Sequence, residues 1–151
     1  MRHALAVARS GDLPDADRPL TAEGRRFVAA RALPLLRALP VQPGRILHSP
    51  WRRAAETADL LKTLCARAPE PLASLAAAPR AKMLKDLRGE SVLAVGHQPW
   101  LSELALLLVF GDCRFGADRL RIAQGGMAWL HGDLNPAGMR LMALWPPELA
   151  P

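Results

Sequence analysis

Histidine and arginine side chains that could do chemistry stand at three places in this chain of 151 residues. Arg2 and His3 lie at its start, and Arg53 and His97 each follow shortly after an apolar run typical of a buried strand. The carboxyl ends of parallel strands share one edge of a sheet, and α/β sheets bind their ligands at that edge. We therefore expect these two imidazoles and two guanidinium groups to converge on one site.

This set of side chains is suited to phosphoryl transfer. Arginine forks bind phosphoryl oxygens in pairs, helix N-termini favour a bound anion, and a neutral histidine is a nucleophile toward phosphorus. The sequence has neither a Walker motif nor an Asp-rich metal cluster, so side chains have to supply the positive charge. The pattern predicts metal-independent transfer through a phosphohistidine, with no cofactor and with phosphate or sulfate fitting the pocket.

Strands and helices alternate in the middle of the predicted structure, which indicates a mostly parallel sheet with helices on its faces. Buried strands are predicted at 45–48 and 91–95, because both are short apolar runs bounded by turn residues. Helices are predicted at 50–66, with Ser49 as N-cap, and at 100–110. These two helices place the residues after each strand at the expected site.

The other elements are predicted from weaker signals, and the length favours one domain, 1–151. They are a loop at 10–20, a helix from Thr21 to Ala38 with a break at Pro34, a weak strand at 71–74, a helix at 79–87 and a final hairpin of 127–131 and 139–145.

Four stretches, in order and over nearly the whole chain, carry a family pattern. They are Met-Arg-His-Ala at 1–4, Asp-Arg-Pro-Leu-Thr-Ala-Glu-Gly at 17–24, His-Ser-Pro-Trp-Arg-Arg-Ala-Ala-Glu-Thr-Ala at 48–58 and Val-Gly-His-Gln-Pro at 95–99. With them the chain resembles the histidine phosphatase superfamily, and within it the small bacterial phosphohistidine phosphatases of SixA type. The resemblance implies a three-layer α/β/α sandwich with a mostly parallel sheet, the phosphoglycerate mutase-like fold.

Carried over by position, the resemblance implies a role for each residue of the expected site. His3 is implied to be the nucleophile, with its Nδ1–H held by a backbone carbonyl. Arg2 and Arg53 are implied to hold the phosphoryl oxygens, and His97 to complete the pocket as a charged hydrogen-bond donor. Arg18, in the loop into the first helix, is implied to bind substrate at the rim.

Arg53 rather than its neighbour Arg52 is the family's arginine, which stands four residues after the serine of the motif. About 100° separates successive residues around a helix, so only one of the two arginines can easily face the pocket.

Two features depart from the family pattern. Members carry an apolar strand before Arg-His, whereas only Met1 precedes it here, so we expect a truncated first strand and a natural start that lies upstream.

Many members also place a glutamate general acid where this sequence has Ser74, and Glu70 lies too early. An alkoxide leaving group needs that proton, whereas an imidazole nitrogen, with a pKa of about 6.5 to 7, needs it less. The second departure favours phosphohistidine substrates, and the absence of a long capping insertion favours a protein that carries one, such as a signalling relay or carrier domain.

The composition limits the classes of partner that we expect the protein to bind. The net charge of +6 comes from 17 arginines against 3 lysines, without a basic tail, so most of it is read as compositional bias and nucleic-acid binding is not favoured. No apolar run is long enough to span a membrane or to serve as a secretory signal, and a cytoplasmic protein is expected.

Other functions stay open on the sequence alone. One is a phosphomonoesterase of the same superfamily that acts on phosphorylated small molecules, and another is a degenerate member that binds phosphorylated partners without turnover. A single histidine such as His48 or His131 is more often structural than catalytic.

Overall fold

The computed structural model describes residues 1–113 and 119–149. Its central sheet consists of three parallel strands in the order β2-β1-β3. β1 (Arg45–His48) pairs along its whole length with β3 (Val92–Val95) and at its end with β2 (Glu70–Pro71). The predicted strands at 45–48 and 91–95 are thus confirmed, while the strand predicted at 71–74 is shorter and earlier.

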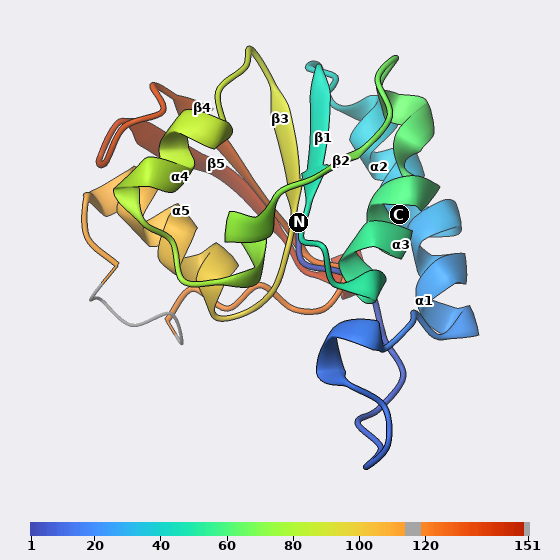
Figure 1. Cartoon of the computed structure of the whole chain (residues 1–151). Coiled ribbons are helices and arrows are strands. Elements are labelled where there is room, and N and C mark those ends of the chain that lie inside the picture. The colour runs from blue at the N-terminus through green and yellow to red at the C-terminus, as the bar shows by residue number, and fades with distance from the viewer. Residues whose placement is uncertain (114–118, 150–151) are drawn as a thin grey trace.

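The predicted hairpin is also confirmed. β4 (Met127–Gly132) and β5 (Met139–Trp145) form a separate antiparallel pair, in which Trp129 stacks on Trp145 with ring centroids 6.3 Å apart. Figure 1 shows this hairpin, in red, to the left of β3 and behind α4.

Helices cover both faces of the central sheet (Figure 1). Neighbouring strand residues point to opposite faces, so Ile46 packs in one core with α2 and α3, and Leu47 packs in another with α4 and α5. The structure is therefore the predicted α/β fold with a mostly parallel sheet between helical layers. The helices are α1 (Ala22–Phe27), α2 (Leu33–Ala38), α3 (Arg52–Leu60), α4 (Ala81–Asp86) and α5 (Trp100–Phe110).

The first predicted helix is interrupted before Pro34, where the break was predicted. Thr21 caps α1 as predicted, because its hydroxyl accepts a hydrogen bond from Gly24 N at 2.9 Å. A π-helical stretch over Val28–Ala32 then joins α1 to α2. Pro34 lies in the first turn of α2, where a residue without an N–H is tolerated. The helix therefore takes the wider π-helical geometry before Pro34, and it continues through this proline as α2.

The helix predicted at 50–66 is wrong at both ends. α3 begins at Arg52 with Trp51 as its N-cap residue, so Ser49 is not the cap. It ends at Leu60, and a 3₁₀ turn over Lys62–Leu64 follows. A 3₁₀ turn aligns residues three apart, which lets Leu61 and Leu64 both enter the core. The helix predicted at 79–87 is confirmed over 81–86.

Two isolated bridges precede α1 among the described residues, an antiparallel one between Ala6 and Leu20 and a parallel one formed by the segment Met1–His3. Met1–His3 lies alongside the end of β3, where Arg2 is bridged to Gly96 and the Met1 amino group donates to Ala94 O at 2.8 Å. No helix within residues 1–113 or 119–149 is long and apolar enough to cross a membrane.

Candidate active site

The expected site residues meet at the carboxyl-terminal edge of the sheet. Arg53 follows β1 in the first turn of α3, and His97 follows β3. His3 lies beside His97 because its backbone N–H donates to Gly96 O at 3.0 Å. The ring centroids of the two histidines are 5.1 Å apart. His3, Arg53 and His97 are all at most 4% exposed, so the fold brings together three of the predicted residues in one buried cluster.

The His3 ring is fixed in one tautomer. Its Nδ1 lies 2.7 Å from Ala4 O, and a carbonyl only accepts, so Nδ1 carries the proton. Arg53 Nε donates to His3 Nε2 at 3.1 Å, which leaves Nε2 without a proton. The prediction of a backbone carbonyl at Nδ1 is confirmed. Thr57, on α3, accepts from Ala4 N at 3.2 Å and thereby holds this backbone in place.

Burial lowers the pKa of His3 to about 4. The hydrogen bond to Ala4 opposes this shift, while the positive charges of Arg53 and Arg2 add to it. His3 is therefore neutral at pH 7, as a nucleophile toward phosphorus has to be.

We expect an NMR titration of the ligand-free protein to give a midpoint for the His3 ring near pH 4. The unfolded chain binds this proton at about pH 6.5. The unfolded chain therefore binds this proton more tightly than the folded protein. As a result, the contribution of His3 to the free energy of unfolding is constant above about pH 6.5 and decreases as the pH falls from 6.5 to 4. A spectrum of His3→Ala assigns the resonance, and a midpoint at or above 6.5 contradicts the described burial.

Every donor group of Arg53 is engaged in the ligand-free site. Besides His3, it donates through Nη1 to Asp15 O and through Nη2 to Asp15 Oδ2, the latter at 3.2 Å. Its guanidinium carbon lies 4.6 Å from the centroid of the Trp51 ring. All three nitrogen atoms of this guanidinium group therefore have hydrogen-bond partners within the described residues.

Arg2 is placed at the same site from the other side. Its Nη1 donates to Ile122 O at 3.2 Å, and its buried Nε has no hydrogen-bond partner among the described residues. Burial, then Arg121 and Arg53, lowers its pKa. Arg121 is thus a further nearby cation, which the sequence motifs did not single out.

His97 differs from its prediction in charge. Its Nε2 hydrogen-bonds the hydroxyl of Ser49 at 2.8 Å, and within the described part of the chain its buried Nδ1 has no partner. Burial, then the charges of His3 and Arg53, lowers its pKa to about 3. The ligand-free ring is therefore neutral and not a charged donor. A phosphoryl dianion beside it favours the protonated form.

Aromatic rings border the site near His97. The Trp51 and His97 centroids are 4.5 Å apart, and Trp100 lies 5.8 Å from Trp51 and 6.0 Å from His97. Both tryptophans are half-buried. Trp51 and Trp100 meet edge to face, with an angle of 71° between their rings, and form an aromatic border that the motif analysis did not identify.

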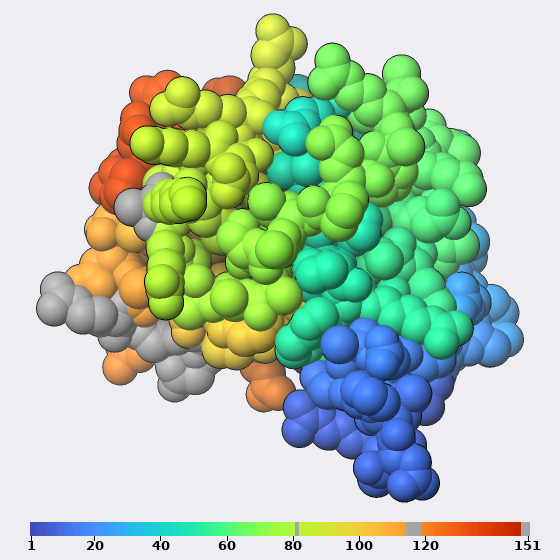
Figure 2. All heavy atoms as spheres, viewed as in Figure 1, coloured from blue at the N-terminus to red at the C-terminus, as the bar shows by residue number. Residues whose placement is uncertain are grey.

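A carboxylate that the sequence analysis missed also reaches the site. Asp15 lies in a 3₁₀ turn of the loop before α1, and its Oδ1 accepts from Arg18 Nε at 2.8 Å and from Arg9 Nε at 2.9 Å. Figure 2 shows this loop, in blue, projecting beside α3. Asp15 thus lies between Arg18 and Arg53, and the implied contact of Arg18 with substrate stays a prediction.

Asp15 is not a proton donor. Hydrogen bonds and positive charge from the surrounding arginines hold the pKa of its carboxyl well below its usual range. At the position expected for the general acid, Ser74 lies in a 3₁₀ turn, and Glu70 pairs with Arg45 at 3.1 Å. The rejected arginine, Arg52, is exposed and pairs with Glu56 on the helix surface at 2.9 Å.

The carboxylate of Asp15 occupies donors of Arg53 that an anion would need. We expect Asp15→Asn to remove this like-charge repulsion, and so to lower the constant for competitive inhibition of phosphatase turnover by inorganic phosphate by about tenfold. Asp17→Asn is the matched control, since Asp17 lies in the same turn and is exposed. Its inhibition constant should stay within about twofold. Weaker inhibition in Asp15→Asn would mean that Asp15 orients the arginines for the anion.

No family model and no curated protein matches the sequence. Solved structures do match. One described as the phosphohistidine phosphatase SixA of Nakamurella multipartitia is 28% identical, with 97% of this chain and 93% of that chain covered and a TM-score of 0.76. The protein histidine phosphatase SixA complexed with tungstate is 22% identical, with 97% and 94% covered and a TM-score of 0.78.

A structure described as an α-ribazole-5'-P phosphatase from Escherichia coli is 20% identical, with 95% of this chain and 93% of that chain covered and a TM-score of 0.73. The buried cluster lies where the motifs placed it, and the folds agree over nearly the whole length. The chain therefore has the fold of the SixA-type histidine phosphatases, which confirms the resemblance drawn from its motifs.

Proposed function

We propose that the protein is a phosphohistidine phosphatase that acts on a histidine-phosphorylated protein through a phosphorylated His3. The observation that carries this proposal is the unprotonated His3 Nε2 in a buried cluster with Arg53 and His97. A nucleophile fixed in the right tautomer beside cationic donors is the arrangement that phosphoryl transfer requires.

The reaction has two balanced steps. In the first, His3 Nε2 forms a bond to phosphorus in line with the leaving nitrogen, and the nitrogen–phosphorus bond of the substrate breaks. Water then attacks phosphorus, the bond to Nε2 breaks, and phosphate leaves with His3 restored. Arg2, Arg53 and His97 stabilise the charge on the three equatorial oxygens of the phosphoryl group in both steps.

Two buried atoms supply the donors for this anion. Arg2 Nε and His97 Nδ1 lack partners among the described residues, and a buried polar atom without a hydrogen bond costs free energy. A phosphoryl group between them satisfies both, which supports an anion-binding role for the cluster.

The leaving group favours phosphohistidine over an ester. Asp15 is ionised and bound to arginines, so it cannot protonate a leaving alkoxide. An imidazole leaving group needs less help, and the half-buried rings of Trp51 and Trp100 offer it aromatic contacts at the border of the site. The fold does not decide this point, because it also occurs in a phosphatase of a small phosphorylated molecule.

The test uses a protein domain phosphorylated on histidine with a labelled phosphate. We expect release of phosphate at a rate well above the uncatalysed one, and rapid quenching should trap label on His3 that is labile to acid and stable to base. A sugar phosphate at equal concentration should turn over at least about a hundredfold more slowly, the loss typical of a missing general acid.

Three results contradict the proposal in different ways. Faster turnover of the sugar phosphate points to the small-molecule phosphomonoesterase. Binding of the phosphorylated domain without phosphate release points to a non-catalytic binding protein. Label trapped on a residue other than His3 contradicts the assigned nucleophile.

A further inference from the structure

The ring of Trp51 contacts two of the side chains that hold the phosphoryl group in the proposed reaction. Its centroid lies 4.5 Å from that of the His97 ring, and the guanidinium carbon of Arg53 lies 4.6 Å from it. Trp51 is the N-cap residue of α3 and Arg53 lies in the first turn of this helix, so one stretch of backbone positions both. The ring of Trp51 therefore borders the place where the phosphoryl group is proposed to bind.

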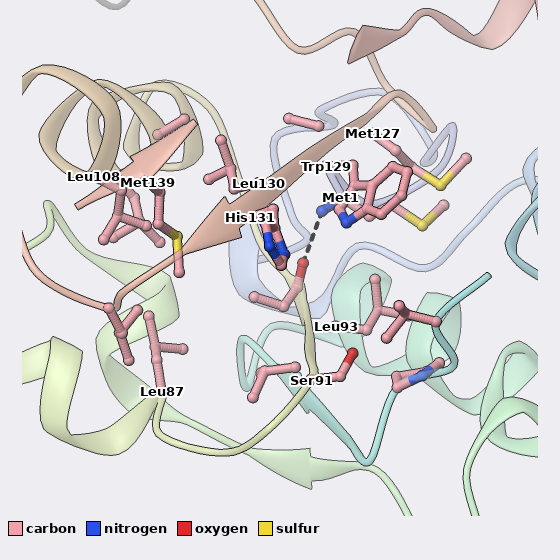
Figure 3. Close-up of a pocket in the computed structure, with 18 of the residues that line it drawn as sticks. Met1, Leu87, Ser91, Leu93, Leu108, Met127, Trp129, Leu130, His131 and Met139 are labelled. Carbon is pink, nitrogen blue, oxygen red and sulfur yellow. Dashed lines mark hydrogen bonds between the residues drawn. The ribbon is translucent and has the colours of Figure 1, made fainter. Parts of the chain in front are cut away.

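The interior of the protein does not receive the group that carries the phosphate. A cavity of about 410 Å³ lies between β3 and β4 (Figure 3). Met1 and Ala94 are among the described residues that line it, but His3, Arg53 and His97 are not. The cavity is therefore separate from the buried cluster, and the carrier of the phosphoryl group has to extend toward solvent.

The two tryptophans lie on the way from the buried cluster to solvent. His3, Arg53 and His97 are at most 4% exposed. Trp51 and Trp100 are half-buried and lie 4.5 Å and 6.0 Å from the His97 ring. A leaving group that extends outward from a phosphoryl group in the cluster thus passes these rings.

The shape of this border suits a small flat ring. The centroids of Trp51 and Trp100 are 5.8 Å apart, and the two rings meet at 71°. A ring that lies parallel to one tryptophan is therefore nearly perpendicular to the other. Offset-stacked and edge-to-face contacts are the arrangements that aromatic pairs prefer, so an imidazole can make both at once, whereas an amine has no face to present.

Trp51 already contacts groups of this kind in the ligand-free site. The guanidinium of Arg53 is flat and charged, and the His97 ring is itself an imidazole, tilted by 49° against the indole. Tryptophan is the aromatic residue that binds cations best. A released imidazole, with a pKa of about 6.5 to 7, is partly protonated at neutral pH, so its neutral and charged forms both gain from contact with the indole.

The polar groups at the same border do not distinguish a ring from an amine. Asp15 and Arg18 are bound to each other at 2.8 Å, and a carboxylate accepts from a ring N–H as it does from an amine N–H. Discrimination therefore falls to the aromatic side chains. Of the two tryptophans, Trp51 contacts both Arg53 and His97.

We propose that Trp51 determines the substrate specificity of the site, because its ring contacts the leaving group and selects phosphoryl groups carried on an aromatic ring nitrogen over those carried on an amine. This selection rests on the proposed function, since it concerns the leaving group of that reaction. Trp100 forms the second side of the corner.

The test compares two small compounds that share a phosphorus–nitrogen bond, 1-phosphoimidazole and phosphoramidate. Their kcat/KM values are measured for the wild-type chain, Trp51→Leu and Trp51→Phe. We expect Trp51→Leu to lower the ratio of the two values, imidazole over amine, by about tenfold, the size of a lost stacking or cation–π contact. Trp51→Phe keeps an aromatic face, so its ratio should stay within about threefold of the wild-type ratio.

Trp129→Leu is the matched control, because it makes the same exchange in the hairpin, where Trp129 stacks on Trp145. Its ratio should stay within about twofold of the wild-type ratio, whatever its effect on stability. Equal losses on the two compounds in Trp51→Leu leave the ratio unchanged. That result would show that Trp51 only holds Arg53 in place, and it overturns the proposal.

A failure of the proposed function gives a different result. If neither compound is hydrolysed, the reaction is wrong, and the affinities of both compounds, measured by NMR, decide the role of Trp51. Selection requires that 1-phosphoimidazole bind more tightly and that Trp51→Leu lose this preference, whereas equal affinities overturn it. Should Trp51→Leu not fold, the ring protons of 1-phosphoimidazole bound to His3→Asn have to show nuclear Overhauser contacts with Trp51, and their absence overturns the proposal.

Discussion

His3→Ala is expected to reduce phosphate release from a histidine-phosphorylated protein by at least about ten-thousandfold, equivalent to about 5.4 kcal/mol of transition-state stabilisation. The substitution removes Nε2, the atom to which the phosphoryl group is transferred in the proposed reaction, and water in its place is neither oriented nor as nucleophilic. Rates of phosphate release and quench trapping of labelled protein measure the effect. The trapped label should disappear together with the turnover.

His131→Ala is the matched control. His131 is exposed at the end of β4, and its removal should change the rate by no more than about twofold. Because His3 is buried, His3→Asn, which better preserves the volume and polarity, separates lost chemistry from lost folding. If either His3 variant folds and keeps more than about a tenth of the wild-type rate, His3 is not the nucleophile.

The position of the site could be predicted because the signals are local. Arg53 and His97 each come a few positions after an apolar run. Each of these runs is enough by itself to identify a buried strand. The parallel sheet then brings the strand ends together. Nothing beyond the chain order of strand, turn and helix is needed to place these side chains at one edge.

The features that sequence could not predict depend on contacts between distant positions. Ser49 before Pro50 has the pattern of a helix cap, but its hydroxyl bonds His97, 48 positions away. Asp15 reaches Arg53 over 38 positions from a loop whose sequence indicates only a turn. The neutral state of His97 follows from burial and from the charges around it, which no local pattern records.

The second large effect is expected from the loss of a donor that stabilises the charge on the phosphoryl oxygens. We expect Arg53→Lys to lower kcat/KM by about a hundredfold to a thousandfold, the range for loss of one donor to a developing anion. In free energy this is about 3 to 4 kcal/mol. Arg53 spans Nε at His3 and both Nη groups at Asp15, and the same fork can hold two phosphoryl oxygens. A lysine keeps the charge but presents a single point donor, so it cannot span both.

Arg52→Lys provides the matched control, because it makes the same exchange one position earlier on an exposed face of α3 where the partner is Glu56. Its kcat/KM should stay within about twofold of the wild-type value. The fork argument further requires that affinity for inorganic phosphate fall in Arg53→Lys, since the lost donor holds oxygens in the bound anion as well as in the transition state. Equal losses in the two variants, or an unchanged phosphate affinity in Arg53→Lys, would show that Arg53 acts through folding of the loop around Asp15 and not by holding the phosphoryl group.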